Sequence, residues 1–109
     1  SAMSVVGYVK RSSYCASKGA VAQLTKVLAG EWAPYNITVN TVAPTFIYTP
    51  FTEPMFKDEE FHNDVKRRIL LGRVGEVDDV VGAVLYLASD AADFVTGSIM
   101  MVDGGWTAW

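Results

Sequence analysis

The chain has 109 residues, of which 50% are hydrophobic and 19% are charged, and this balance indicates a globular domain with a buried core rather than a disordered segment. The formal net charge of -3 and the lack of a basic cluster argue against nucleic acid as a partner. Because no apolar run reaches the length of a membrane span, no signal peptide is recognisable, and the one cysteine, Cys15, has no internal disulfide partner, we expect a cytoplasmic protein.

The N-terminal residues 1–12 show neither a helical nor a strand period. We expect them to be the end of a strand that runs into a loop. Since this start is abrupt and lacks an initiator methionine, we also expect the chain to be a piece of a longer protein.

A helix is predicted over residues 13–33. Its apolar residues recur at intervals of three and four positions, and Ser12 or Ser13 is suited to cap its start, whereas Pro34 marks its end. The apolar stripe consists of Val21, Leu24, Leu28 and Trp32. Small residues elsewhere on this helix would let another element approach closely, namely Ala16, Gly19, Ala20, Ala22, Ala29 and Gly30.

The remaining elements follow from shorter patterns. The β-branched residues 36–43 predict a strand, and the proline-rich residues 44–54 predict a loop. Apolar periodicity predicts helices over residues 59–70 and 77–89, the second with Glu76, Asp78 and Asp79 at its N-terminal end, where the helix dipole favours acids. Residues 97–105 predict a last short strand that enters a glycine turn.

Strands that alternate with helices favour an α/β domain with a parallel sheet. Two strands alone would leave both sheet edges unpaired and the helices only partly covered. We therefore expect further strands from a missing part of the chain or from a partner.

The segment "YCASK" is the first candidate for chemistry, because it sets Tyr14 and Lys18 four residues apart on one face of the predicted helix. A neighbouring ammonium group favours the phenolate and so lowers the pKa of a tyrosine, which prepares it for general acid–base catalysis. By spacing alone, a partly buried tyrosine beside a solvated lysine is the favoured explanation of the pair, because both residues are common on helices.

The wider pattern resembles the short-chain dehydrogenase/reductase family. The segments "YCASKGAV", "NITVNTVAP" and "GRVGEVDDVVGAVLYLASDAADFVTGSIMMVDGGW" occur in the order and at the spacings of the C-terminal half of that family. The resemblance implies that residues 1–109 are the C-terminal, catalytic-tyrosine half of one Rossmann-like, doubly wound parallel sheet, with its last two strands and their helices. The N-terminal dinucleotide-binding half is absent, since no glycine-rich turn for a pyrophosphate is present.

The same resemblance implies an NAD- or NADP-dependent oxidoreductase. A hydride would pass between nicotinamide and the carbonyl or secondary alcohol of a sugar, a sugar acid or a 3-oxoacyl chain, and the ending "VDGGWTAW" favours the sugar-acid type. We expect a homo-oligomer, a dimer or tetramer, that acts on a small molecule, and we expect the isolated chain to be inactive. The alternative is a truncated, non-enzymatic relative that acts only by association with another chain.

The family's site residues carry over to matching positions. Tyr14 is implied as the catalytic acid/base, Lys18 as its cationic neighbour and a ligand of the cofactor ribose, and Ser1, or else Ser4, as the residue that polarises the carbonyl. The loop after the first predicted strand is implied to bind the cofactor through Pro44, Thr45, Ile47 and Thr49. Thr45 stands where the family usually has glycine, so the path of the loop is open to question.

Other residues allow two interpretations. Four apolar side chains form either a lid over the substrate or ordinary core, namely Phe46, Phe51, Met55 and Phe56. His62 is expected on a helix surface, with no metal site, and Trp106 and Trp109 are expected at a subunit interface rather than in the core. A serine hydrolase built on Ser1 or Ser17 with Lys18 is disfavoured, because no nucleophile elbow is present.

Overall fold

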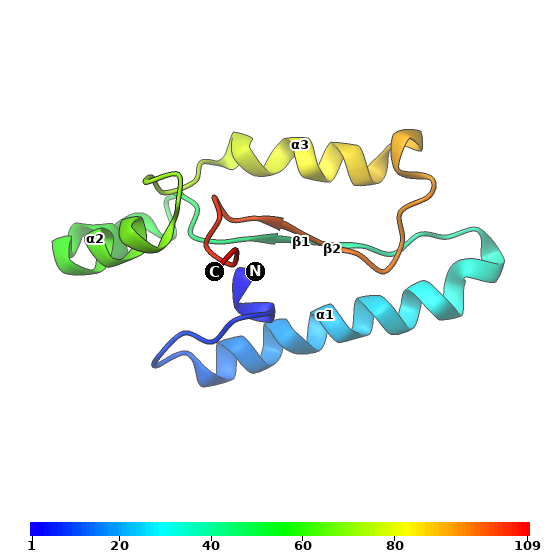
Figure 1. Cartoon of the computed structure of the whole chain (residues 1–109), viewed down its shortest axis with the longest axis horizontal. Helices are drawn as coiled ribbons and strands as arrows, with labels where there is room; N and C mark the ends of the chain where they lie inside the picture. The colour runs from blue at the N-terminus through cyan, green and yellow to red at the C-terminus, as the bar shows by residue number, and fades with distance from the viewer.

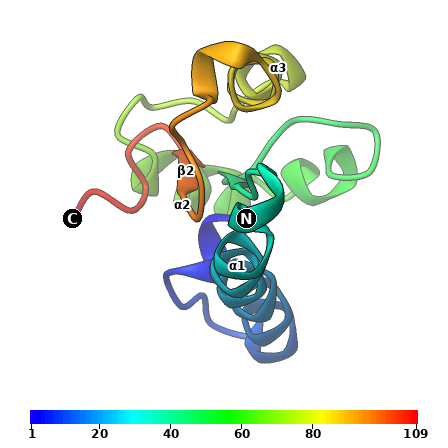
Figure 2. The ribbon, with the colours of Figure 1, turned by 90° about the vertical axis from the view of Figure 1, so that its right-hand side faces the viewer.

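The computed structural model describes all residues from Ser1 to Trp109. Its helices are α1 (Ser12–Trp32), α2 (Glu59–Arg68) and α3 (Val77–Ala88), and its strands are β1 (Thr41–Pro44) and β2 (Ile99–Val102). The two strands lie in the middle, with α1 on one face and α3 on the other, while α2 stands beyond one end of the sheet (Figure 1). The view along the long axis shows the same three layers (Figure 2), so the predicted α/β class is confirmed.

The sheet consists of β1 and β2, which pair in parallel with Thr41 opposite Ile99 and Pro44 opposite Val102. Both strands are shorter than the sequence predicts. The segments that lead into the two strands are joined by hydrogen bonds of a side chain, that of Asn40, instead of by a continued backbone ladder. The Asn40 amide donates to the carbonyl of Val95 at 2.8 Å, and its oxygen accepts from the amide of Ser98 at 3.1 Å.

Helix α1 packs on the sheet through small residues. Its buried positions are Ala22, Thr25 and Ala29, and the Thr25 hydroxyl is hydrogen-bonded to the hydroxyl of Thr41 on β1. The predicted apolar stripe does not face this core, since Val21 and Leu24 are 50% and 54% exposed. The prediction that small residues allow a close approach is therefore confirmed for Ala22 and Ala29, whereas Ala16, Ala20 and Gly30 are exposed.

The start of α1 differs from the prediction. Arg11 occupies the N-cap position with no side-chain hydrogen bond, and Ser12 is already the first helical residue. Residues Ala2–Ser4 form a 3-10 turn rather than the end of a strand, and Ser1 caps this turn. A second 3-10 turn that contains Pro34 follows α1, and the chain reverses at Asn36 with a φ of 58°.

Helix α3 begins with a network of the predicted acids. The amide of Glu76 donates to Asp79 Oδ2 at 2.7 Å, and the Arg73 guanidinium donates two hydrogen bonds to the same carboxylate at 2.6 and 2.8 Å. The Arg73 hydrogen bonds and charge lower the pKa of Asp79 well below its usual range, with a further contribution from the Glu76 amide. The carboxylate thus fixes the point where the chain enters the helix.

The core lies where α2 and both ends of the chain meet, away from the middle of α1 and α3. Its buried cluster consists of Ala2, Met3, Phe56, Val65, Ile69 and Trp106. Trp106 is thus part of the core of this chain, contrary to the predicted interface position, whereas Trp109 is 87% exposed. The turn after β2 needs glycine, because Gly104 has a φ of 59° and a Cβ there would stand 2.5 Å from Cγ2 of Ile69.

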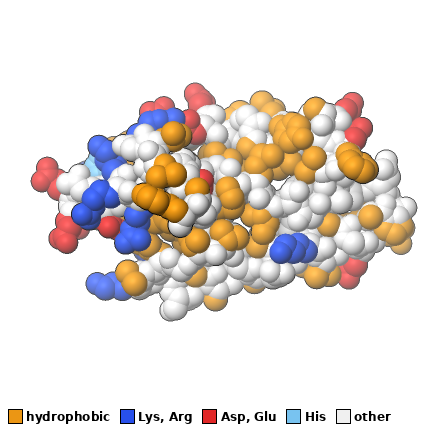
Figure 3. Space-filling view, viewed as in Figure 1, with side chains coloured by type: hydrophobic (Ala, Val, Ile, Leu, Met, Phe, Trp, Pro, Cys, Tyr) orange, Lys and Arg blue, Asp and Glu red, His pale blue; other side chains and the backbone are white.

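Much apolar surface is left uncovered. Only 12 of 109 residues are buried, and the radius of gyration of 15.2 Å exceeds the value of about 13 Å expected for a compact chain of this length. Hydrophobic side chains are spread over the face shown in Figure 3, including the region of α3. On α3, Val77, Val84 and Leu85 are 56%, 49% and 64% exposed. None of the helices combines the length and apolar character needed to cross a membrane.

Candidate active site

A cavity of about 250 Å³ lies beyond the carboxyl end of β1. Its wall is built by the N-terminal segment, the first turn of α1 and the loop that follows β1. In open parallel sheets this edge is the usual place for a ligand. The lining residues are Ser1, Met3, Tyr8, Arg11, Tyr14, Thr45, Phe46, Ile47, Thr49, Phe51, Thr52 and Met55. Most of the residues predicted to carry chemistry therefore meet in one place.

Tyr14 contributes its ring to this cavity from the first turn of α1 and remains 44% exposed. Lys18, one turn further along, holds its Nζ 5.4 Å from the centroid of that ring. No hydrogen bond within the chain engages the Tyr14 hydroxyl, and no acid pairs with Lys18. The phenol is thus free to meet a ligand, with a cation beside it.

The two candidate serines lie in different surroundings. Ser1 lines the cavity, and its Oγ accepts a hydrogen bond from the amide of Met3 at 3.2 Å. Ser4 does not line the cavity, and its Oγ is buried with no hydrogen-bond partner. The structure thus brings Ser1, and not Ser4, into the cavity with Tyr14.

The loop after β1 begins with Pro44 and Thr45. Pro44 is the last residue of β1 and does not line the cavity, whereas Thr45 does. Thr45 avoids the left-handed region that would favour glycine, so a threonine fits the path of this loop without backbone strain. Its hydroxyl oxygen is buried and has no hydrogen-bond partner in the chain.

Two further residues of the loop reach the cavity, Ile47 and Thr49. Ile47 is held against Gly75 by a parallel bridge, in which the amide of Gly75 donates to the carbonyl of Phe46 at 3.0 Å. The Thr52 hydroxyl closes the loop by donating to the carbonyl of Ile47 at 2.6 Å and accepting from the amide of Thr49 at 2.9 Å. The loop therefore has a defined shape without any ligand.

The nicotinamide group that the sequence pattern implies can be tested against this wall. A buried hydroxyl without a hydrogen-bond partner lowers the stability of the fold by about 1–3 kcal/mol. A polar group from outside the chain that hydrogen-bonds to the Thr45 hydroxyl would remove this cost. An amide of the carboxamide kind can donate or accept the missing hydrogen bond. The residues present therefore fit a nicotinamide on this side of the cavity.

The four apolar residues that the sequence assigns either to a lid over the substrate or to the core do not all lie in one place. Phe56 is buried in the core cluster at 7% exposure and does not line the cavity. Phe46 packs against the core and also lines the cavity, while Phe51 is 89% exposed at its rim. Met55 lines the cavity as well. The cavity wall and the core are thus continuous through Phe46.

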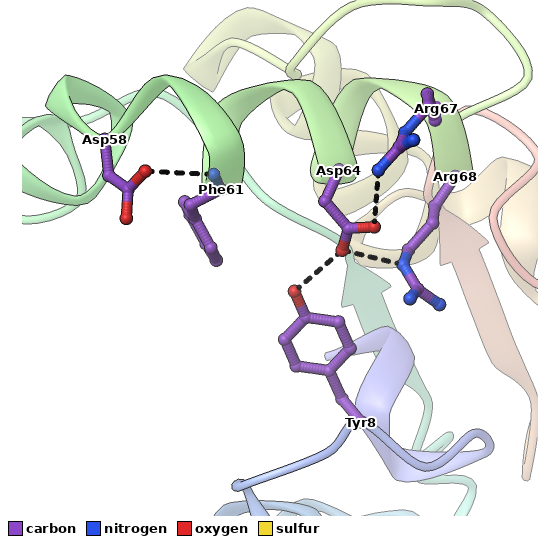
Figure 4. Close-up of polar contacts among 6 residues, drawn as sticks. All are labelled: Tyr8, Asp58, Phe61, Asp64, Arg67 and Arg68. Atoms are coloured by element: carbon purple, nitrogen blue, oxygen red, sulfur yellow. Dashed lines mark hydrogen bonds and ion pairs between the residues drawn. The ribbon is translucent and has the colours of Figure 1, made fainter.

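Two lining residues, Tyr8 and Arg11, have no place in the sequence-based interpretation. The Tyr8 hydroxyl donates to Asp64 Oδ2 on α2 at 3.4 Å, and Arg68 Nε donates to the same oxygen at 3.0 Å (Figure 4). Burial, then the charge of Asp64, raises the pKa of Tyr8, while the hydrogen bond from Arg68 lowers the pKa of Asp64. Arg11 could have been found from its position three residues before Tyr14, which makes the two neighbours at the start of α1. Tyr8 carries no such signal.

His62 lies on α2 as predicted, half-buried, with its ring centroid 5.4 Å from that of Phe56. No group of three or more histidine, cysteine or acidic side chains gathers anywhere in the chain as a metal site would require. The polar side chains that line the cavity are the hydroxyl groups of serine, threonine and tyrosine and the guanidinium of Arg11.

Comparison with known proteins gives one consistent result. The family model described as enoyl-(acyl carrier protein) reductase matches residues 1–107. The chain is 47% identical over 106 residues to 2-dehydro-3-deoxy-D-gluconate 5-dehydrogenase of Bacillus subtilis, covering 97% of this chain and 42% of that protein. It is also 47% identical over 98 residues to galactitol 2-dehydrogenase (L-tagatose-forming) of Cereibacter sphaeroides, covering 90% and 39%. The chain thus spans about two fifths of the length of these relatives.

The fold agrees with solved structures of such enzymes. A gluconate 5-dehydrogenase from Burkholderia cenocepacia, in complex with NADP and tartrate, superposes with a TM-score of 0.96 at 38% sequence identity. The match covers 100% of this chain and 43% of that one.

Proposed function

Because the chain belongs to the short-chain dehydrogenase/reductase family, we propose that it forms the catalytic-tyrosine half of an NAD- or NADP-dependent oxidoreductase. Its parallel strands between helical layers are the C-terminal part of the Rossmann-like sheet of such enzymes. The observation that carries the proposal is the convergence of Ser1, Tyr14 and the loop after β1 on one cavity.

Tyr14 is the proposed acid/base of the reaction. Its free hydroxyl exchanges a proton with the oxygen of the substrate, and the ammonium of Lys18 lies 5.4 Å from the centroid of its ring. Ser1 donates a hydrogen bond from its Oγ to the same substrate oxygen and polarises the carbonyl. Both groups act on one atom, so the cavity has to hold the substrate between them.

Nicotinamide, when bound, supplies or accepts the hydride. The unpaired Thr45 hydroxyl, the Ile47 backbone and the Thr49 hydroxyl are the proposed contacts to it, with Lys18 as the contact to the ribose. Pro44 acts by fixing the start of the loop, because it is the last residue of β1 and is not itself exposed to the cavity. Either NAD or NADP is compatible with these contacts.

A sugar or a sugar acid is the proposed substrate class. The curated relatives described above are named for a sugar acid and for a sugar alcohol. The cavity combines hydroxyl groups for hydrogen bonds with apolar side chains for the carbon skeleton, which suits such molecules. A 3-oxoacyl chain, the third candidate from the sequence pattern, has less support from these names.

The remaining strands of the sheet and the pyrophosphate-binding turn are proposed to come from further parts of the protein. Support comes from the exposed apolar faces of α1 and α3 and from a sheet of only two strands. We therefore propose that the isolated chain is inactive and that the complete protein is a homo-oligomer. The same exposed faces favour a second candidate, a non-enzymatic relative that acts by association with another chain. The cytoplasmic location stays a prediction from composition.

The experiment that tests the proposal uses the full-length protein and its Tyr14→Phe variant with NAD⁺ and NADP⁺. Loss of the phenolic proton should lower kcat for a sugar-acid substrate by about 10²–10⁴-fold. Cofactor affinity, measured by calorimetry, should stay within about twofold, because the ring and its contacts remain. Retained turnover in this variant would refute the role of Tyr14. A protein that binds neither cofactor would support the non-enzymatic candidate.

A further inference from the structure

The cavity has an unbalanced positive charge. Among the side chains that line it, Arg11 is the only one that carries a formal charge. Arg11 takes part in none of the three ion pairs of the chain, and its guanidinium donates no hydrogen bond within it. A guanidinium group has five donors, so this one is available to a ligand.

No acid of the chain compensates this charge at the cavity. The carboxylate that touches the cavity wall, through the Tyr8 hydroxyl, is that of Asp64. It already pairs with Arg67 at 3.4 Å and with Arg68 at 3.0 Å, as Figure 4 shows. The Asp64 carboxylate, which is the negative charge nearest to this wall along the hydrogen-bond network, is thus already paired with two arginines of α2. It does not neutralise the positive charge of Arg11.

The position of Arg11 relates it to the proposed chemistry. It is the N-cap residue of α1, and Tyr14 follows three positions later, so both side chains extend from the same turn into the same cavity. A small substrate whose reacting oxygen meets Tyr14 can therefore extend its far end toward Arg11. Thr49, Thr52 and the apolar Met55 also line this cavity.

We propose that Arg11 is the specificity-determining residue of this site and binds the carboxylate of a sugar-acid or hydroxy-acid substrate. The planar guanidinium matches a carboxylate with two parallel hydrogen bonds, which an uncharged alcohol group in the same place cannot make. The proposal rests on the proposed oxidoreductase function and narrows its substrate class to anions.

The test compares two substrates of equal shape in the full-length protein with NAD⁺ and NADP⁺. D-Gluconate and D-glucitol share their chain of hydroxyl groups and differ at one end, which is a carboxylate in the first and a CH₂OH group in the second. Replacing Arg11→Gln should lower kcat/KM for D-gluconate roughly 10- to 100-fold, mainly through KM, and leave that for D-glucitol within about twofold. Arg11→Lys, which keeps the charge without the fork, should be intermediate.

The matched control is Lys10→Asn, which removes the neighbouring cation that does not line the cavity. Asparagine is chosen because Lys10 has a φ of 63°, which asparagine tolerates well. This variant should leave the ratio of the two kcat/KM values unchanged. If Lys10→Asn lowered this ratio as much as Arg11→Gln does, the preference for the anion would come from the overall charge of the protein, and the proposal would be overturned.

Other outcomes also decide the matter. The proposed role of Arg11 is wrong if Arg11→Gln lowers kcat/KM equally for both substrates, or if it leaves kcat/KM for both unchanged. It is also wrong if the variant raises KM for the cofactor instead. If the wild-type protein oxidises neither substrate, calorimetric titration of D-gluconate into its NADP⁺ complex replaces the kinetics, and binding that is absent or insensitive to Arg11→Gln overturns the proposal. Oxidation of D-glucitol that is lost in Tyr14→Phe but not in Arg11→Gln would uphold the oxidoreductase function by itself.

Discussion

Replacing Gly75→Ala should change the cavity more than it changes stability. A Cβ at this position would stand 2.6 Å from Cδ1 of Ile47 and 3.4 Å from the carbonyl oxygen of Phe46. The backbone contact is tolerable, but the methyl group of Ile47 has to retreat by about 1 Å to reach an ordinary van der Waals distance. Because Ile47 lines the cavity, this movement alters the wall proposed to meet the nicotinamide.

The energetic consequence of Gly75→Ala follows from two opposing effects. An off-rotamer isoleucine costs about 0.5–1.5 kcal/mol. Gly75 lies outside the left-handed region, so alanine also gains about 0.4–1 kcal/mol by restricting the unfolded chain. The free energy of unfolding should therefore fall by no more than about 1 kcal/mol, whereas the affinity for NAD⁺ or NADP⁺ should fall several-fold.

The assay is urea unfolding together with calorimetric cofactor titration of the full-length protein. Gly82→Ala on α3 is the matched control, since a Cβ there meets nothing within 4 Å, and this variant should gain up to about 1 kcal/mol with cofactor affinity unchanged. If Gly75→Ala were stabilised as much as Gly82→Ala, the close contact with Ile47 would be refuted. If its cofactor affinity were unchanged, the proposed role of Ile47 would be wrong.

Two further predictions concern the core and the turn after β2. Val65→Ala removes two methyl groups from a fully buried side chain and should lower the free energy of unfolding by about 2 kcal/mol, measured by urea unfolding, whereas truncation of the exposed Val9 to alanine should change it by less than about 0.5 kcal/mol. Burial tends to raise the pKa of Asp103, but hydrogen bonds from the hydroxyl and amide of Thr107 and the amide of Gly105 outweigh it and lower the pKa. A carboxylate with a lowered pKa stabilises the fold above its unfolded value near 3.8 and loses this contribution as the pH falls through the folded value. Asp103→Asn should therefore lower the unfolding free energy by about 1–3 kcal/mol at pH 7, and the deficit should shrink toward pH 3; a deficit independent of pH would contradict this assignment.

The helices could be predicted from the sequence because their signals are local. Acids on both sides of Val77 and a proline after Trp32 mark the start of α3 and the end of α1 closely. The buried face of α1 could not be predicted in this way. Its larger apolar residues suggest a core-facing stripe, yet Ala22 and Ala29 make the contact with the sheet, because only small side chains allow α1 to approach so closely. Strand length also depended on tertiary contacts, since Asn40 replaces part of the ladder.

The cavity could be predicted only in part, for a related reason. Tyr14, Thr45 and Ile47 belong to segments with recognisable patterns, and they do meet at the cavity. Tyr8 reaches it because the chain turns sharply at Lys10, whose φ of 63° nothing in the sequence demands. Arg11 could have been found from its spacing to Tyr14, whereas neither pattern nor spacing points to Tyr8.

The contact between Tyr8 and Trp106 has a consequence for the order of folding. Their rings lie 5.8 Å apart in the structure, although 98 positions separate them in the chain. Loops of this length are slow to close, and the wall of the cavity depends on this closure, since Tyr8 and Phe46 both pack on Trp106. Tyr14 and Lys18 are therefore synthesised before this wall of the cavity can form, because the wall is complete only after the segment that carries Trp106 has been made.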